Sequence, residues 1–101
     1  MKGSEKQIKW AEDIINGAYH VLDWCDYQRE TNSRFYVVQD GDYLSAEATE
    51  ALRAEFATAF EKCDYAGMII DKRDYFSRQS IIKRGRTWMH KNGQLPKGVI
   101  I

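Results

Sequence analysis

Apolar residues recur at alternating steps of three and four positions between residues 8 and 25 of the chain. They are Ile8, Ala11, Ile15, Ala18, Leu22 and Cys25. This spacing places them on one stripe of an α-helix and predicts an amphipathic helix of about 25 residues. Ser4, followed three positions later by Gln7, forms the capping-box pattern that marks a helix start. Because an apolar stripe must be buried, other segments have to pack against it.

A second helix is predicted over the segment that follows Ser45, which is its expected N-cap. The alanines of this segment raise its intrinsic helix propensity. Its apolar stripe consists of Ala48, Leu52, Phe56, Ala59, Phe60 and Cys63.

Two more helices are predicted in the C-terminal part of the chain. Asp64 is the expected N-cap of a short helix, in which Gly67 would permit close packing. The residues available for burial there are Met68, Ile69 and Ile70. The last helix begins at Ser77 and is closed by Asn92 and Gly93, before Pro96. Its apolar side consists of Ile81, Ile82, Gly85, Trp88 and Met89.

Residues 31–44 break the helical period and predict a loop or a short strand. Phe35–Val38 is β-branched and aromatic, Asp40–Asp42 is a turn signal, and the other strand candidate is Val99–Ile101. The sequence therefore predicts a mainly α fold of three or four packed helices, with one irregular segment or short strand between the first two. A length of 101 residues fits a single helical domain, residues 1–101.

The chain lacks the sequence motifs that are typical of several functional classes. The chain has no P-loop, GxGxxG or HExxH motif, and His20 and His90 lie in opposite halves. Cys25 and Cys63 are 38 positions apart without a CxxC motif, so we expect buried reduced thiols. No apolar run approaches the roughly 20 residues that span a bilayer, and the N-terminal segment lacks a secretory or transit pattern. We expect a cytoplasmic, non-enzymatic protein without a cofactor, a metal or a membrane contact.

The charges are segregated along the chain, although they sum to zero. Residues 1–65 carry 7 Lys/Arg and 13 Asp/Glu, a net charge of −6, whereas residues 66–101 carry 8 and 2, a net charge of +6. Three interpretations are open: the basic part is neutralised by the acidic helices, it orients a protein partner, or it neutralises nucleic-acid phosphates. No helix-turn-helix, RNP or KH signature accompanies the third interpretation.

The last helix concentrates the positive charge and is the predicted partner-binding surface. Trp88 is the predicted aromatic anchor beside it. The basic residues of this surface are Lys83, Arg84, Arg86, His90 and Lys91, with Arg73 and Arg78 nearby. The sequence favours a protein-binding accessory module, and direct nucleic-acid binding by the same helix is the alternative. It does not indicate an oligomeric state.

Two segments resemble a pair of motifs in small, uncharacterised helical proteins of bacteria and their mobile elements. "GSEKQIKWAEDI" matches a G-S-x-K-Q-x-x-W-A-E opening, and "DYAGMIIDKRDYF" is similar to a later D-A-x-x-x-I-D-x-R helix. The resemblance covers Gly3 to Asp13 and Asp64 to Arg73. It implies a helical module with no assigned chemistry, and it transfers no catalytic residue.

The resemblance also implies contacts between the two motifs. Asp71 and Arg73 would pair with each other, and Gly67-Met68 departs from the pattern, in which aromatic residues are common there. The residues expected to dock are Gln7, Trp10 and Ala11 on one side and Ile69, Ile70 and Arg73 on the other. By analogy, the mobile-element association implies a phage-type accessory protein, including an inhibitor of a host defence system such as an anti-CRISPR protein.

Overall fold

The computed structural model describes residues 1–31 and 44–94, and this part of the chain is helical. The elements are α1 (Glu5–Thr31), α2 (Ala46–Glu61), α3 (Ala66–Asp71), the short 3-10 helix η3 (Arg73–Phe76) and α4 (Arg78–Lys91). The predicted mainly α fold is confirmed. Phe35–Val38, Asp40–Asp42 and Val99–Ile101, the predicted turn and strand segments, lie outside the described residues.

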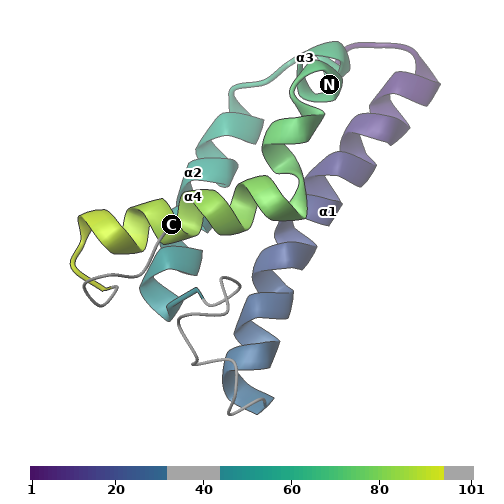
Figure 1. Cartoon of the computed structure of the whole chain (residues 1–101). Helices are drawn as coiled ribbons and strands as arrows, with labels where there is room; N and C mark the ends of the chain where they lie inside the picture. The colour runs from purple at the N-terminus through teal and green to yellow at the C-terminus, as the bar shows by residue number, and fades with distance from the viewer. Residues whose placement is uncertain (32–43, 95–101) are drawn as a thin grey trace.

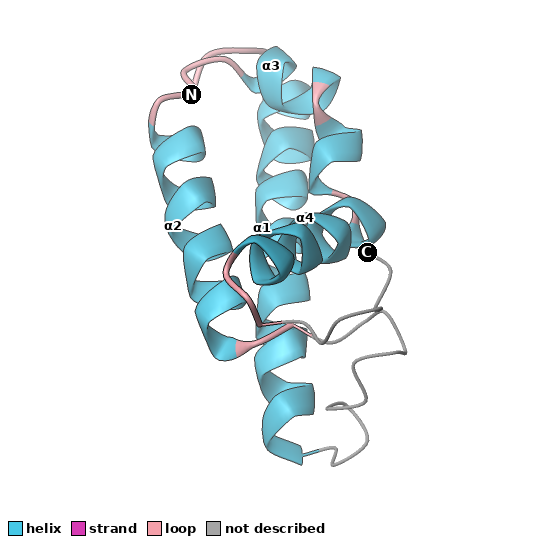
Figure 2. Cartoon of the chain, turned by 60° about the vertical axis from the view of Figure 1, so that its left-hand side comes forward, coloured by secondary structure: helices cyan, strands magenta, loops and turns pink. Residues whose placement is uncertain are grey.

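The two long helices run side by side in opposite directions, and α4 lies across both of them (Figure 1, Figure 2). The short helices α3 and η3 connect the end of α2 to α4 and sit near the start of α1 (Figure 1). No helix in the described part of the chain combines the length and the apolar character needed to cross a membrane.

The start of α1 has the predicted capping box. The backbone N–H of Ser4 donates to Gln7 Oε1 at 3.0 Å, and the backbone N–H of Gln7 donates to Ser4 Oγ at 3.2 Å. The predicted stripe faces the interior, where Ala11, Ala18, Leu22 and Cys25 are buried and Ile8 and Ile15 are half-buried. Helix propensity, capping and burial therefore agree along the whole of α1.

The residues before α1 are joined to the loop that precedes α3. The backbone N–H of Ala66 donates to the Lys2 carbonyl at 2.8 Å, and Lys2 forms a parallel bridge with Tyr65. Gly3 has a φ of +148°, and a Cβ on it would lie 3.1 Å from the Ala66 Cβ. Glycine at this position therefore allows the N-terminal segment to approach α3.

The same pairing corrects the predicted start of α3. Tyr65, not Asp64, is the N-cap residue, and no side chain caps the helix. The Lys2 carbonyl accepts from the N–H of Ala66, so a backbone acceptor from a distant segment satisfies one of the N–H groups that the start of a helix leaves without an intrahelical partner.

The main core lies where α4 crosses α1 and α2. Leu44 is fully buried, and a Cβ on Gly85 would lie 2.5 Å from Leu44 Cδ2, so the α4 backbone rests directly on this leucine. Ser77 caps α4 by accepting from the Ser80 N–H, and Gly93 follows the helix with a φ of +70°. The core residues are Ala18, Leu22, Cys25, Leu44, Ala48, Leu52, Phe56, Ile81, Ile82 and Met89.

A second, smaller core joins α1 to α3, and it brings together the two motifs of the resemblance. Ala11 packs with Ala66 and Ile69, and the guanidinium of Arg73 lies 5.6 Å from the centroid of the Trp10 ring. These contacts match the expected docking of Trp10 and Ala11 against Ile69 and Arg73. The Gln7 side chain instead completes the α1 capping box.

Three other expectations about α3 are wrong. Met68 is 52% exposed, because it lies on the side of α3 opposite the second core. A Cβ on Gly67 would have no neighbour within 4 Å, so this glycine serves no close approach. Within the described residues no ion pair joins Asp71 to Arg73, whose Nη1 donates to the Ile70 carbonyl at 2.9 Å.

We expect Gly85→Ala to lower the free energy of unfolding by about 1–3 kcal/mol, the usual effect of overpacking a buried site. The added methyl group would overlap the confined Leu44 side chain. Chemical denaturation measures the change. Gly17→Ala on α1 is the control, because nothing lies within 4 Å of its Cβ position and alanine should stabilise this helix interior by about 0.5–1 kcal/mol. Equal behaviour of the two variants would contradict the close packing of α4 on Leu44.

We expect Ser4→Ala to lower the free energy of unfolding by about 1 kcal/mol, because it removes the acceptor for the Gln7 N–H. Ser80→Ala serves as a control, since only the backbone of Ser80 takes part in the α4 cap. An unchanged denaturation midpoint for Ser4→Ala would mean that this cap does not contribute to stability.

Candidate partner-binding site

The arginines predicted to meet a partner are largely held by rings of the same chain. The guanidinium of Arg78 lies 4.0 Å from the centroid of the Trp24 ring, and that of Arg73 lies over Trp10. Arg84 lies over Tyr75, with its guanidinium 4.8 Å from the ring centroid. Such cation–π contacts stabilise by about 0.5–1 kcal/mol at exposed sites. These arginines therefore connect α4 and η3 to the rest of the fold.

Arg84 is also neutralised by an acid of α2. Its Nη2 forms a hydrogen-bonded ion pair with Glu55, and its Nη1 donates to the Tyr75 carbonyl at 3.3 Å. At this position the basic C-terminal half and the acidic N-terminal half pair within one molecule.

Arg86 does not lie on the solvent side of α4, contrary to the prediction, because only 3% of it is exposed. It follows Ile82 by four positions and precedes Met89 by three, so the helical period places it beside these buried residues. The sequence "KRGR" reads as one basic block, but the helix divides it between two faces.

Besides Arg78, which is exposed at the start of α4 and lies over Trp24, three more of the predicted basic residues are exposed on this helix: Lys83, His90 and Lys91. They lie on one outer face of the helix with the partly exposed Thr87 between them, and we call these four residues the α4 stripe. Trp88, the predicted anchor, is half-buried and packs against the main core. It therefore supports α4 as well as reaching the surface.

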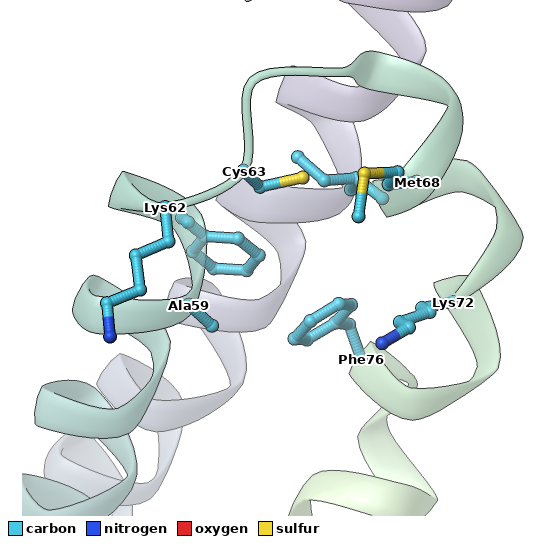
Figure 3. Close-up of a pocket in the computed structure, with 8 residues that line it drawn as sticks. Ala59, Lys62, Cys63, Met68, Lys72 and Phe76 are labelled. Carbon is cyan, nitrogen blue, oxygen red and sulfur yellow. The ribbon is translucent and has the colours of Figure 1, made fainter.

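A groove opens between α2 on one side and α3 with η3 on the other (Figure 3). It consists of two adjoining hollows that share Ala59, Lys72 and Phe76. The first hollow has a volume of about 190 Å³, and its other lining residues are Phe60, Lys62, Cys63, Met68 and Ile69. The second has a volume of about 280 Å³, and its other lining residues are Glu55, Phe56, Tyr75 and Arg84. Because Arg84 belongs to α4, the groove extends to that helix.

The walls of the groove are aromatic and its rim is cationic. Phe60 and Phe76 have ring centroids 4.9 Å apart, and Phe56 and Phe76 have centroids 5.6 Å apart. Figure 3 shows the Lys62 side chain on the α2 side and the Lys72 side chain on the η3 side. An open apolar surface with charged edges is typical of a site that binds another molecule.

The cysteines occupy different environments, which corrects the prediction that both are buried. Cys25 lies in the main core, whereas Cys63 is half-buried and lines the groove. The predicted apolar stripe extended to Cys63, but α2 ends at Glu61, so Cys63 lies in the loop before α3.

Sequence reasoning missed an ion-pair network between α1 and α2. Arg53 of α2 binds Asp23 and Asp26 of α1, each at 2.7 Å, and Glu50 of its own helix at 2.8 Å. Arg29 binds Asp26 at 2.7 Å. The i, i+3 spacing of Asp26 and Arg29 was the available signal, whereas the pairing across the two helices depends on their packing.

This network shifts the pKa of two groups. Burial would raise the pKa of Asp26, but hydrogen bonds from Arg29 and Arg53 outweigh it and hold the pKa below its usual value. Burial would lower the pKa of Arg53, but hydrogen bonds to Asp26 and Asp23 outweigh it and raise the pKa above the usual range. Both shifts favour the charged forms, so the network is a structural link between the helices.

Within residues 1–31 and 44–94 no group of three or more His, Cys, Asp or Glu side chains is arranged to hold a metal ion. No family model, curated protein or solved structure matches the chain.

We expect Asp26→Asn to reduce the loss of stability on acidification. Since the folded-state pKa of Asp26 is lowered, its contribution is present above the unfolded value of about 3.9 and is lost as the pH falls through the folded-state pKa. Denaturation of both proteins between about pH 6 and pH 2 measures the difference. Asp13→Asn, at an exposed position of α1, is the control and should follow the wild type. Identical pH profiles for the wild type and Asp26→Asn would contradict this role.

Proposed function

We propose that this chain is a cytoplasmic, non-enzymatic module that binds another protein through the groove and the adjacent α4 stripe. One observation supports this most strongly: an open groove with phenylalanine walls borders a helix that carries exposed cations. Protein interfaces combine apolar anchors at the centre with polar and charged residues at the rim. The groove would supply the anchor sites, and Lys83, His90 and Lys91 would supply part of the rim.

The alternative, direct nucleic-acid binding by α4, has less support. Binding of a polyanion depends on how many phosphates the protein neutralises. On the described part of α4, Arg84 pairs with Glu55 and Arg86 is buried, so the basic surface is smaller than its sequence suggests. The exposed lysines Lys83 and Lys91 are better suited to orienting an acidic protein surface.

A biological setting follows only from the resemblance in Gly3 to Asp13 and Asp64 to Arg73. On that basis we propose an accessory protein of a phage or mobile element, and an inhibitor of a host defence system of the anti-CRISPR kind is one example. Such inhibitors can act by occupying a surface. A groove with a charged rim is compatible with that mode and requires no active site.

We expect a photo-crosslinking amino acid at Thr87 to form discrete protein adducts in cells of the organism that encodes the chain. Combining it with Lys83→Glu and Lys91→Glu should lower the adduct yield about tenfold, because the charge reversals repel an acidic partner. Exposed helix positions usually tolerate substitution within about 0.5 kcal/mol, so the fold should persist.

Two controls accompany this measurement. Lys6→Glu with Lys9→Glu makes the same charge change at exposed positions of α1 and should leave the adducts unchanged. The crosslinker at Asn16, also exposed on α1, should not form them. Adducts that are insensitive to the α4 reversals would exclude the α4 stripe as the partner surface. Tight, steeply salt-dependent binding of a labelled duplex or single strand that the reversals abolish would instead favour the nucleic-acid alternative.

A further inference from the structure

The groove has features that specify the chemistry of its partner. We infer that it binds an acidic amphipathic helix, which places apolar side chains in the two hollows and carboxylates against Lys62 and Lys72. This inference rests on the proposed protein-binding function and names the kind of segment that the partner would contribute.

The division of the groove suits two side-chain anchors. The hollows measure about 190 Å³ and 280 Å³. They adjoin through Ala59, Lys72 and Phe76, so two anchors on neighbouring turns of one helix would reach both hollows. Amphipathic helices bind grooves through such anchors at i, i+3, i+4 and i+7.

The lining of the groove suits apolar side chains. Phe76 stands between Phe56 and Phe60 and packs against both, so the aromatic wall is supported by the core. Met68 is 52% exposed at the mouth of the first hollow (Figure 3). Methionine is unbranched and polarisable, which lets it adjust to different apolar partners.

The charges of the groove favour an acidic partner. Among the described residues that line it, Glu55 is the one acid, and this carboxylate is already paired with Arg84. Within the described residues no ion pair or hydrogen bond engages the ammonium of Lys62 or of Lys72. Figure 3 shows Lys72 directed toward the groove, whereas the Lys62 side chain extends along the outer side of α2. Neither ammonium has a neutralising acid in that part of the chain, so carboxylates on a bound helix would complement Lys72 at the groove and Lys62 at its α2 rim.

The test uses a fluorescent synthetic peptide of about four helical turns, with leucines on one face and glutamates on the other. Binding is measured by fluorescence anisotropy on the full chain. A peptide of the same composition in scrambled order and a peptide with lysines in place of the glutamates are the probe controls. We expect measurable binding of the acidic amphipathic peptide and at least about tenfold weaker binding of both controls.

Two variants of the groove test whether the acidic peptide binds there. Ala59→Trp would fill the part that both hollows share, so binding should be lost, whereas Ala57→Trp, at an exposed α2 position outside the lining, should leave it unchanged. Lys62→Glu with Lys72→Glu should weaken binding about tenfold through repulsion. Lys6→Glu with Lys9→Glu is the matched charge control. Thermal melts establish that each variant is folded.

Cys63 provides a second readout that needs no substitution. Its thiol lines the first hollow, whereas Cys25 is buried in the main core. Bound peptide should therefore slow alkylation of Cys63 by iodoacetamide, and Ala59→Trp should abolish this protection by the peptide.

The inference is overturned if the acidic amphipathic peptide does not bind, or if the scrambled peptide or the lysine peptide binds as well as it does. It is also overturned if Ala59→Trp binds the acidic peptide like Ala57→Trp. Self-association of the chain that Ala59→Trp abolishes would also overturn it, because a second copy would then be the occupant. If the acidic peptide does not bind but the Thr87 adducts form and depend on Lys83 and Lys91, only the inference about the groove is rejected, and the proposed protein-binding function stands. If the acidic peptide binds and no such adducts form, the proposal that the α4 stripe is part of the partner-binding surface is rejected instead.

Discussion

The contact of Leu44 with Gly85 determines how the helices are arranged. The Leu44 carbonyl accepts from Arg29 of α1, at 2.7 Å from Nη2 and 3.2 Å from Nε, and its side chain is fully buried beneath α4. Because residue 85 has no side chain, α4 can lie directly on this leucine. That position inserts Ile81 and Met89 into the main core. It also determines which residues of α4 face solvent and brings Arg84 to the edge of the groove.

The charge segregation of the sequence does not persist as two oppositely charged surfaces. Arg84 reaches back to Glu55 on α2, and Arg73 and Arg78 stack on tryptophans of α1, so part of the basic half is distributed over the acidic half. Guanidinium groups suit this role because they are planar and weakly hydrated, and lysines more often remain in water. The exposed cations beside the groove and on α4 that do not lie over an aromatic ring are accordingly lysines, which makes them charges available to a partner.

Local sequence signals predicted the helices well, and contacts between helices were harder to predict. The caps at Ser4, Ser45 and Ser77 and the stripe of α1 depend on residues close in sequence, and all were identified. The α1–α2 network around Arg53 requires two helices to be placed first. The run of basic residues at positions 83–86 indicated a solvent-facing Arg86, whereas the helical period places it on the buried side of α4. The groove could not be predicted, since it depends on where α2 ends and on the path of the chain through α3 and η3.

The close backbone contacts at Gly3 and Gly85 also restrict which substitutions the fold tolerates. Gly3 combines a positive φ with contact to Ala66, and Gly85 lies against Leu44, so a side chain at either position would collide with a neighbour or strain the backbone. Surface lysines and glutamates are under no such geometric constraint and can be exchanged during evolution. Distant relatives should therefore be recognisable by small residues at positions 3, 66 and 85 within a helical frame, even where their charge pattern has diverged.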